Sequence, residues 1–144
     1  PKTSSAASDV YKRQADSFQM ARLISAMAFI GTIIAIWLAL RVANMTRENS
    51  ESNVVTKLLS TGFGLCVMVG SWIQFSLAAN GWKIFAGRLE VIGIENTPEP
   101  ELAQGIIDFA GSTTPGMTPT PVGIAFLVIV TLMILGLIWG PKNN

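Results

Sequence analysis

The sequence offers few side chains that could do chemistry, and its single thiol is the first to consider. Cys66 is the only cysteine among 144 residues, and the chain contains no histidine. A catalytic cysteine needs a neighbouring base, most often a histidine, to take its proton, so we interpret Cys66 as a small structural side chain. The same composition excludes histidine-based catalysis, haem ligation and zinc sites, and a lone cysteine excludes an internal disulfide.

Carboxylates are the second candidates, because their oxygens bind divalent cations. The acidic residues late in the chain are Glu90, Glu95, Glu99, Glu101 and Asp108. Their spacing matches no calcium-binding loop, so we interpret them as a solvated acidic face. The sequence also lacks a GxGxxG motif, a P-loop, a CxxC pair and a charge in the middle of any apolar run. We therefore expect no enzymatic activity, no cofactor and no metal, and we identify no small-molecule substrate.

Polar side chains inside an otherwise apolar run are the remaining candidates. The run at residues 58–79 carries Ser60, Gly64, Ser71 and Gln74. On one helix face these residues would line the pore of a holin-like or channel-forming oligomer. Gln74 could instead hydrogen-bond to another helix, which is the more ordinary role of an amide in a membrane.

The composition indicates the medium that surrounds these residues. Half of the chain is apolar and only 13% is charged, against the ~25% that is usual in soluble proteins. The apolar residues gather in three runs, 23–42, 58–79 and 122–139, and about 20 helical residues cross the ~30 Å hydrocarbon layer. We predict an all-α membrane protein with three transmembrane helices, the third framed by Pro121 and Gly140. The net charge of +1 gives no basic face for nucleic acid.

The segments between the runs predict the organisation of the chain. Polar residues 43–57 would join the first two helices into an antiparallel transmembrane hairpin within residues 15–79, which Asn80 and Gly81 would end. Residues 80–121 are too polar for the bilayer core and too long for a simple turn, so we place them on or outside the membrane. Residues 122–144 would form the third helix and a short tail.

Two parts of the long loop carry their own patterns. Residues 81–94 are apolar enough to lie in the membrane interface, and their periodicity fits either a helix or an extended stretch. A short amphipathic helix is expected at residues 98–110. Thr97 would be its N-cap, Pro98 its first helical residue, and Gly111 its end.

The first fourteen residues, PKTSSAASDVYKRQ, need a separate interpretation. They resemble the translated remnant of a sequencing adapter, and they show neither apolar periodicity nor the apolar core of a signal peptide. We therefore treat residues 1–14 as an artefactual or disordered tail. Under this interpretation the natural amino terminus is missing from the sequence.

Small residues recur at every fourth position in the first two predicted spans. The rows are Gly31, Ala35 and Ala39 in the first, and Gly62, Cys66 and Gly70 in the second. Such rows let two helix backbones approach closely in lipid. We assign them to packing within the hairpin or to self-association. Leucine at Gly62 or Gly70 should therefore disrupt assembly more than leucine at Gly123.

Positive charges predict the orientation of the chain in the membrane. With residues 1–14 excluded from the count, Arg41, Arg47, Lys57 and Lys142 flank the side of the hairpin loop and the carboxyl terminus, whereas Arg22, Lys83 and Arg88 lie opposite. Cytoplasmic loops carry an excess of Lys and Arg. We therefore expect the hairpin loop and the carboxyl terminus in the cytoplasm, with the protein in the inner (plasma) membrane.

The predicted hairpin also invites a comparison with a known family. The span LISAMAFIGTIIAIWLALRV, the loop NMTRENSESN and the terminal NGWKIFAG together resemble the small inner-membrane hairpin proteins of type IVB secretion and conjugation systems. The resemblance covers residues 21–87, and the third span has no counterpart in it. It implies a non-enzymatic subunit of an envelope-spanning transfer apparatus, whose helices pack against copies or partners.

Two other functions fit the same pattern of spans and small-residue rows. One is an accessory subunit of a respiratory, transport or photosynthetic membrane complex, and the other is the channel-forming oligomer considered above. In all three cases the expected partners are the lipid bilayer and other membrane subunits or copies of the chain.

Overall fold

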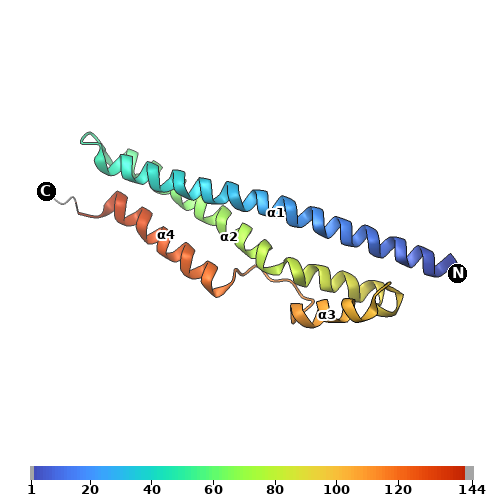
Figure 1. The fold of residues 1–144 in the computed structure, drawn as a ribbon. Coiled ribbons are helices and arrows are strands. Elements are labelled where there is room, and N and C mark those ends of the chain that lie inside the picture. The colour runs from blue at the N-terminus through green and yellow to red at the C-terminus, as the bar shows by residue number, and fades with distance from the viewer. Residues whose placement is uncertain (1, 142–144) are drawn as a thin grey trace. The chain divides into compact units, whose positions relative to one another are not determined.

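The computed structural model describes residues 2–141, and the side chains of residues 5, 6 and 8–141. The described residues contain helices and no strand, as the sequence predicts (Figure 1). The helices are α1 (Lys2–Glu48), α2 (Val54–Ile92), the short 3-10 helix η1 (Ile94–Asn96), α3 (Pro100–Ala110) and α4 (Pro121–Trp139). Lys142, which entered the charge count for orientation, lies outside the described residues.

Three of these helices are long and apolar enough to cross a membrane, which confirms the predicted number of spans. They are Ser8–Glu48 within α1, Val54–Ile92 and Pro121–Trp139. Only 17%, 22% and 28% of their most apolar stretches are buried inside the chain. Large side chains such as Leu59 (71% exposed) and Leu132 (63% exposed) therefore face outward, where lipid or another helix would cover them.

The first two helices are longer than the apolar runs that predict them. The helix α1 starts at Lys2 and passes through the stretch that resembles an adapter remnant. The helix α2 continues through Asn80 and Gly81 to Ile92, so the prediction that this pair ends the helix is wrong. A glycine inside a helix costs only about 1 kcal/mol, and the residues that follow it pack well. The connection between α1 and α2 accordingly shrinks from residues 43–57 to residues 49–53.

The chain divides into two compact units, and α1 and α2 each contribute to both. Unit 1 comprises Pro1–Ala26 and Leu77–Met117, and unit 2 comprises Met27–Ser76 and Thr118–Asn144. Unit 2 contains the turn between α1 and α2 and the whole of α4, whereas unit 1 contains η1 and α3.

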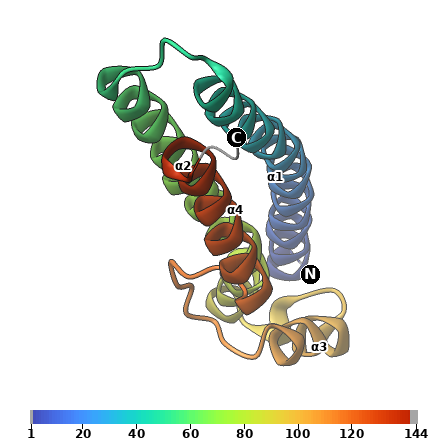
Figure 2. The same cartoon turned by 90° about the vertical axis from the view of Figure 1, so that its left-hand side faces the viewer.

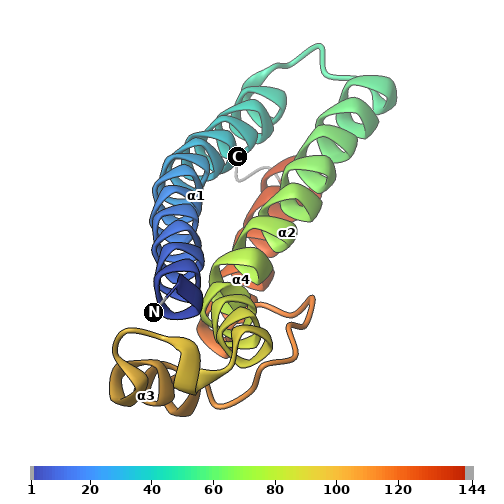
Figure 3. The same ribbon diagram turned by 90° about the vertical axis from the view of Figure 1, so that its right-hand side faces the viewer.

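The core of unit 2 forms where α1, α2 and α4 meet (Figures 2 and 3). Its buried members are Ile36, Ala39, Ala43, Met68, Leu127, Val130, Ile134 and Ile138. The helix α4 starts at Pro121, with the Thr120 hydroxyl oxygen accepting a hydrogen bond from the Gly123 amide at 3.2 Å, and Gly140 is its C-cap. Both ends agree with the predicted frame of Pro121 and Gly140.

The core of unit 1 brings α3 against α1 and α2. Its buried members are Phe18, Phe85, Leu89 and Ala103. The Phe18 ring stacks on the Phe85 ring with centroids 4.2 Å apart, and it lies 5.1 Å from the Trp82 ring. This packing explains why α2 continues beyond Gly81. Of the two conformations that the periodicity allowed, residues 81–92 adopt the helix.

The amphipathic helix exists, but its predicted start is wrong. The helix α3 begins at Pro100 with Glu99 as N-cap, and Thr97 instead caps η1 by donating its hydroxyl to the Ile94 carbonyl at 2.7 Å. A helix that began at Pro98 would need Glu99 in the α conformation, which a following proline disfavours. The predicted end is confirmed, because Gly111 adopts the left-handed conformation with φ of 66°.

Candidate helix-association site

The small-residue row of α1 lies partly inside the chain. Ala39 is 2% exposed and belongs to the core of unit 2. Ala35 is half-buried, whereas Gly31 is exposed and no atom lies within 4 Å of where its Cβ would be. The row therefore contacts the other helices at its carboxyl end and leaves its amino end open.

The small-residue row of α2 is exposed and lies outside the core that α1, α2 and α4 form in unit 2. Gly62, Cys66 and Gly70 are all exposed. A Cβ placed on Gly62 or Gly70 would meet no atom within 4 Å. This row therefore takes no part in packing among the described residues. Of the two roles considered above, packing within the hairpin and self-association, its placement is compatible with association with another molecule.

A different row of α2 makes the contacts inside unit 2. Ser60, Gly64, Met68 and Ser71 are buried, and they recur at helical spacing on the side of α2 opposite to Gly62, Cys66 and Gly70. At Gly64 the helix α4 comes so close that a Cβ would lie 2.8 Å from Ile134 Cγ2. The sequence carried the signal for this row, because serine and glycine four positions apart also form a small-residue pair.

Two of the polar residues of α2 that could line a pore, Ser60 and Ser71, form hydrogen bonds within the chain. The Ser60 and Thr46 hydroxyls lie 2.6 Å apart in a buried contact between α2 and α1. The Ser71 hydroxyl donates to the Val67 carbonyl at 2.7 Å. Gln74 is half-buried, and its amide makes no hydrogen bond with the described residues. Sequence reasoning missed Thr46, whose role depends on where α1 meets α2.

Aromatic and basic side chains gather at the end of unit 2 that holds the turn. The Trp139 indole nitrogen donates to the Thr61 hydroxyl at 3.0 Å, which links α4 to α2. The Lys57 ammonium lies 5.4 Å from the centre of the Trp139 ring. The Arg47 guanidinium donates to the Pro141 carbonyl at 2.8 Å. Tryptophan, lysine and arginine in such a group are typical of a membrane–water interface.

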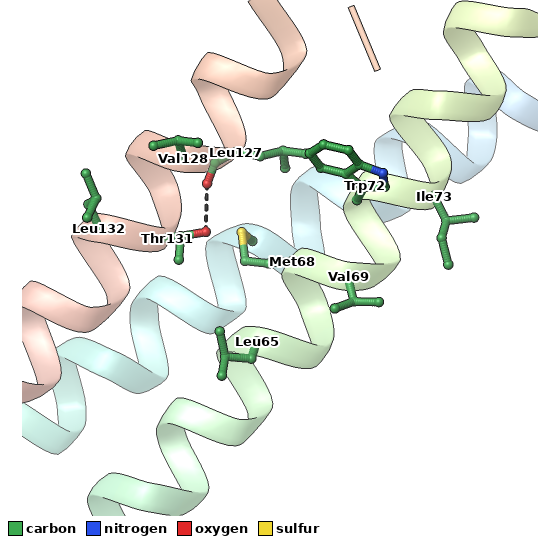
Figure 4. A pocket seen from close by; sticks show the side chains of 9 residues that line it. All are labelled: Leu65, Met68, Val69, Trp72, Ile73, Leu127, Val128, Thr131 and Leu132. Carbon is green, nitrogen blue, oxygen red and sulfur yellow. Dashed lines mark hydrogen bonds between the residues drawn. The ribbon is translucent and has the colours of Figure 1, made fainter. Parts of the chain in front are cut away.

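An apolar groove of about 460 Å³ runs between α2 and α4 (Figure 4). Leu65, Trp72 and Ile73 line it from α2, and Val128, Thr131 and Leu132 line it from α4. The Thr131 hydroxyl is directed back to its own helix, where it donates to the Leu127 carbonyl at 2.7 Å. The groove thus presents almost entirely hydrocarbon, thioether and aromatic surface.

The aromatic core of unit 1 holds a cation of its own. The Arg22 guanidinium carbon lies 5.1 Å from the centre of the Trp82 ring and 6.0 Å from that of Phe18, a geometry typical of cation–π contacts.

Within residues 2–141 no group of three or more Cys, Asp or Glu side chains is arranged to hold a metal ion. The acidic residues of this unit instead lie on its surface, where Gln104 donates to Asp108 at 2.8 Å.

Comparison with protein-family models, curated proteins and solved structures finds no match to this chain. The geometry itself supports two activities. The exposed row of Gly62, Cys66 and Gly70 can bind another helix closely, and the α2–α4 groove can bind an apolar chain.

Proposed function

We propose that this chain is a non-catalytic integral membrane subunit that assembles with copies of itself or with other membrane proteins. The observation that carries the proposal is the exposed row of Gly62, Cys66 and Gly70. Helices gain nothing from burying apolar surface in lipid, and they associate through small residues that let backbones meet. A smooth row left open on one side of α2, opposite to the face that packs within the chain, supports a binding surface for another helix.

The apparatus that we propose is a type IV secretion or conjugation machine in a bacterial inner membrane. The support is the resemblance of residues 21–87 to the small hairpin proteins of those systems. In this proposal α1 and α2 form an antiparallel transmembrane hairpin, and α4 is an additional span. The turn at residues 49–53 and the carboxyl terminus then face the cytoplasm. With residues 1–14 excluded, this side carries four Lys and Arg residues, Lys142 included, against three on the other side, in the direction of the positive-inside rule.

The proteins that co-purify with the full chain in mild detergent test this proposal. We expect mass spectrometry to find secretion ATPases or coupling proteins in the sample. Respiratory, transport or photosynthetic subunits in their place would overturn the assignment to a secretion apparatus. A homogeneous ring of this chain that lets ions leak across liposomes would indicate a channel instead.

Leucine at Gly62 or at Gly70 should lower the association at least tenfold more than leucine at Gly136 does. All three glycines are exposed within a span and have no neighbour within 4 Å of the Cβ position, so only a partner molecule can distinguish them. Gly136 replaces Gly123 as the control, because Gly123 is buried and a Cβ there would lie 3.3 Å from the Thr120 hydroxyl. Crosslinking yield in native membranes measures the association, and equal losses at the three positions would remove the row from the interface.

Cysteine labelling in sealed cells should place the turn between α1 and α2 in the cytoplasm. Ser50→Cys and Ser112→Cys, each in a Cys66→Ala background, position one thiol in the turn and one in the segment between α3 and α4. We expect an impermeant maleimide added outside to label residue 112 and to label residue 50 only after lysis. Labelling of residue 50 alone in intact cells would reverse the proposed orientation.

A further inference from the structure

Residues that line the α2–α4 groove share helix faces with residues at the basic end of unit 2. Lys57, Thr61, Leu65 and Trp72 recur at helical spacing along one face of α2. The first two of them contact Trp139, and the last two line the groove. On α4, Trp139 shares a face with Leu132, which also lines the groove. Along these faces an ammonium group, an indole and the apolar groove follow one another, and we call this succession the track.

The length of this track fits the depth of one membrane leaflet. Lys57 precedes Ile73 by sixteen residues, which corresponds to about 24 Å along a helix. A bilayer with its headgroup regions is ~40–45 Å thick, so one leaflet is about 20–22 Å deep. A molecule with its charged end at Lys57 would therefore have its apolar end in the membrane interior.

Positive charge at this end has no acidic partner among the residues that the structure describes. Neither Lys57 nor Arg47 forms an ion pair with a carboxylate among residues 2–141, and the Arg47 contact with the Pro141 carbonyl leaves its charge uncompensated. Basic pockets between transmembrane helices recruit anionic lipid head groups. A phosphate oxygen forms charge-assisted hydrogen bonds with ammonium and guanidinium groups, which are roughly twice as strong as neutral ones.

We propose that the α2–α4 groove is a binding site for an anionic phospholipid, with one acyl chain along Leu65, Trp72 and Leu132 and the phosphate at Lys57. A second helix fits the groove poorly. A helix with its side chains is about 10–12 Å across, so the about 12 Å of it that would lie beside residues 65–73 fills roughly 1,000 Å³, about twice the 460 Å³ of the groove. An acyl chain is much thinner, and a partner helix would leave Lys57 without an anion.

This site requires that the helices lie in a bilayer, but it depends neither on the exposed glycine row nor on the secretion apparatus. Gly62 and Gly70 are not part of the lining of the groove. The Gly62→Leu variant should therefore keep its lipid preference even where it loses association. Failure of the lipid site and failure of the proposed assembly role are thus separate results.

Native mass spectrometry of the full chain, released from mild detergent with added lipid, tests the proposal. The probes are dioleoyl phosphatidylglycerol and dioleoyl phosphatidylcholine, which share their acyl chains and differ in net charge. We expect about fivefold tighter binding of phosphatidylglycerol, since one basic residue near an anionic membrane contributes about 1 kcal/mol. Lys57→Gln should remove most of this preference, and Lys83→Gln, which lies in unit 1, should keep it.

Leu132→Trp tests the acyl-chain half of the site. The side chain of Leu132 is 63% exposed, so a larger residue there fills the groove without entering the core. We expect binding of both lipids to fall several-fold while the helical circular dichroism stays unchanged. Equal binding of the two lipids by the unsubstituted chain, or a preference that survives in Lys57→Gln, would overturn the proposal. Loss of dimers without any loss of lipid in Leu132→Trp would show that a second copy occupies the groove.

Discussion

Leucine at position 64 is expected to lower the free energy of unfolding by about 2 kcal/mol, whereas leucine at position 62 should not lower it. A Cβ on Gly64 would lie 2.8 Å from Ile134 Cγ2 and 3.5 Å from Ile134 Cδ1. Ile134 is only 3% exposed and packs in the core of unit 2, so it has little space into which to move. Forcing extra carbons into such a core costs typically 1–3 kcal/mol, occasionally more, and we expect the upper part of that range.

The matched control isolates this clash from the effect on the helix itself. Replacing glycine by leucine favours a helix by roughly 1 kcal/mol at either position, and this gain reduces the net loss at position 64. At position 62 no atom of the chain lies within 4 Å of the Cβ, so only the gain remains. Titration with a denaturing detergent, followed by circular dichroism, measures both variants. Equal stabilities would show that α4 does not approach α2 at Gly64.

The same pair of glycines shows what the sequence can predict about packing and what it cannot. Two small-residue rows run along α2, one through Ser60 and Gly64 and the other through Gly62, Cys66 and Gly70. Both satisfy the spacing that permits close helix contact. The choice between them is made by Ile134 of α4 and Thr46 of α1, which are distant in the sequence. A local pattern holds no information about which face a distant segment will meet.

Helix number could be predicted more securely than helix ends, and for a physical reason. Hydropathy reports which residues suit lipid, and it correctly predicted three helices that are long and apolar enough to cross a membrane. A helix ends only where a cap, a proline or a lack of packing stops it. The end of α4 at Gly140 has such a local signal, whereas the continuation of α2 to Ile92 depends on the packing of Phe85 and Leu89 against Phe18 and Ala103.

Alanine at Leu89 is expected to release α3, with hydrogen exchange of its amides rising roughly a hundredfold. The Leu89 side chain is fully buried, and it packs with Phe18 of α1, Phe85 of α2 and Ala103 of α3. Removal of a buried leucine side chain costs about 2–5 kcal/mol. With 11 residues, α3 is shorter than the ~12–15 residues at which an isolated helix becomes even marginally stable in water, so it depends on this contact.

Val91→Ala is the matched control for this prediction, because it removes apolar carbons from the same end of α2 at a side chain that is 89% exposed. We expect it to change exchange in α3 by less than about threefold, since surface substitutions usually alter stability by no more than ~0.5 kcal/mol. Mass spectrometry of deuterium uptake in residues 100–110 provides the comparison. The exchange of η1 should rise together with that of α3 in Leu89→Ala, because η1 contacts α3 and its residue Ile94 packs on the same core. If α3 instead keeps its protection without Leu89, the helix is ordered by something other than the core of unit 1.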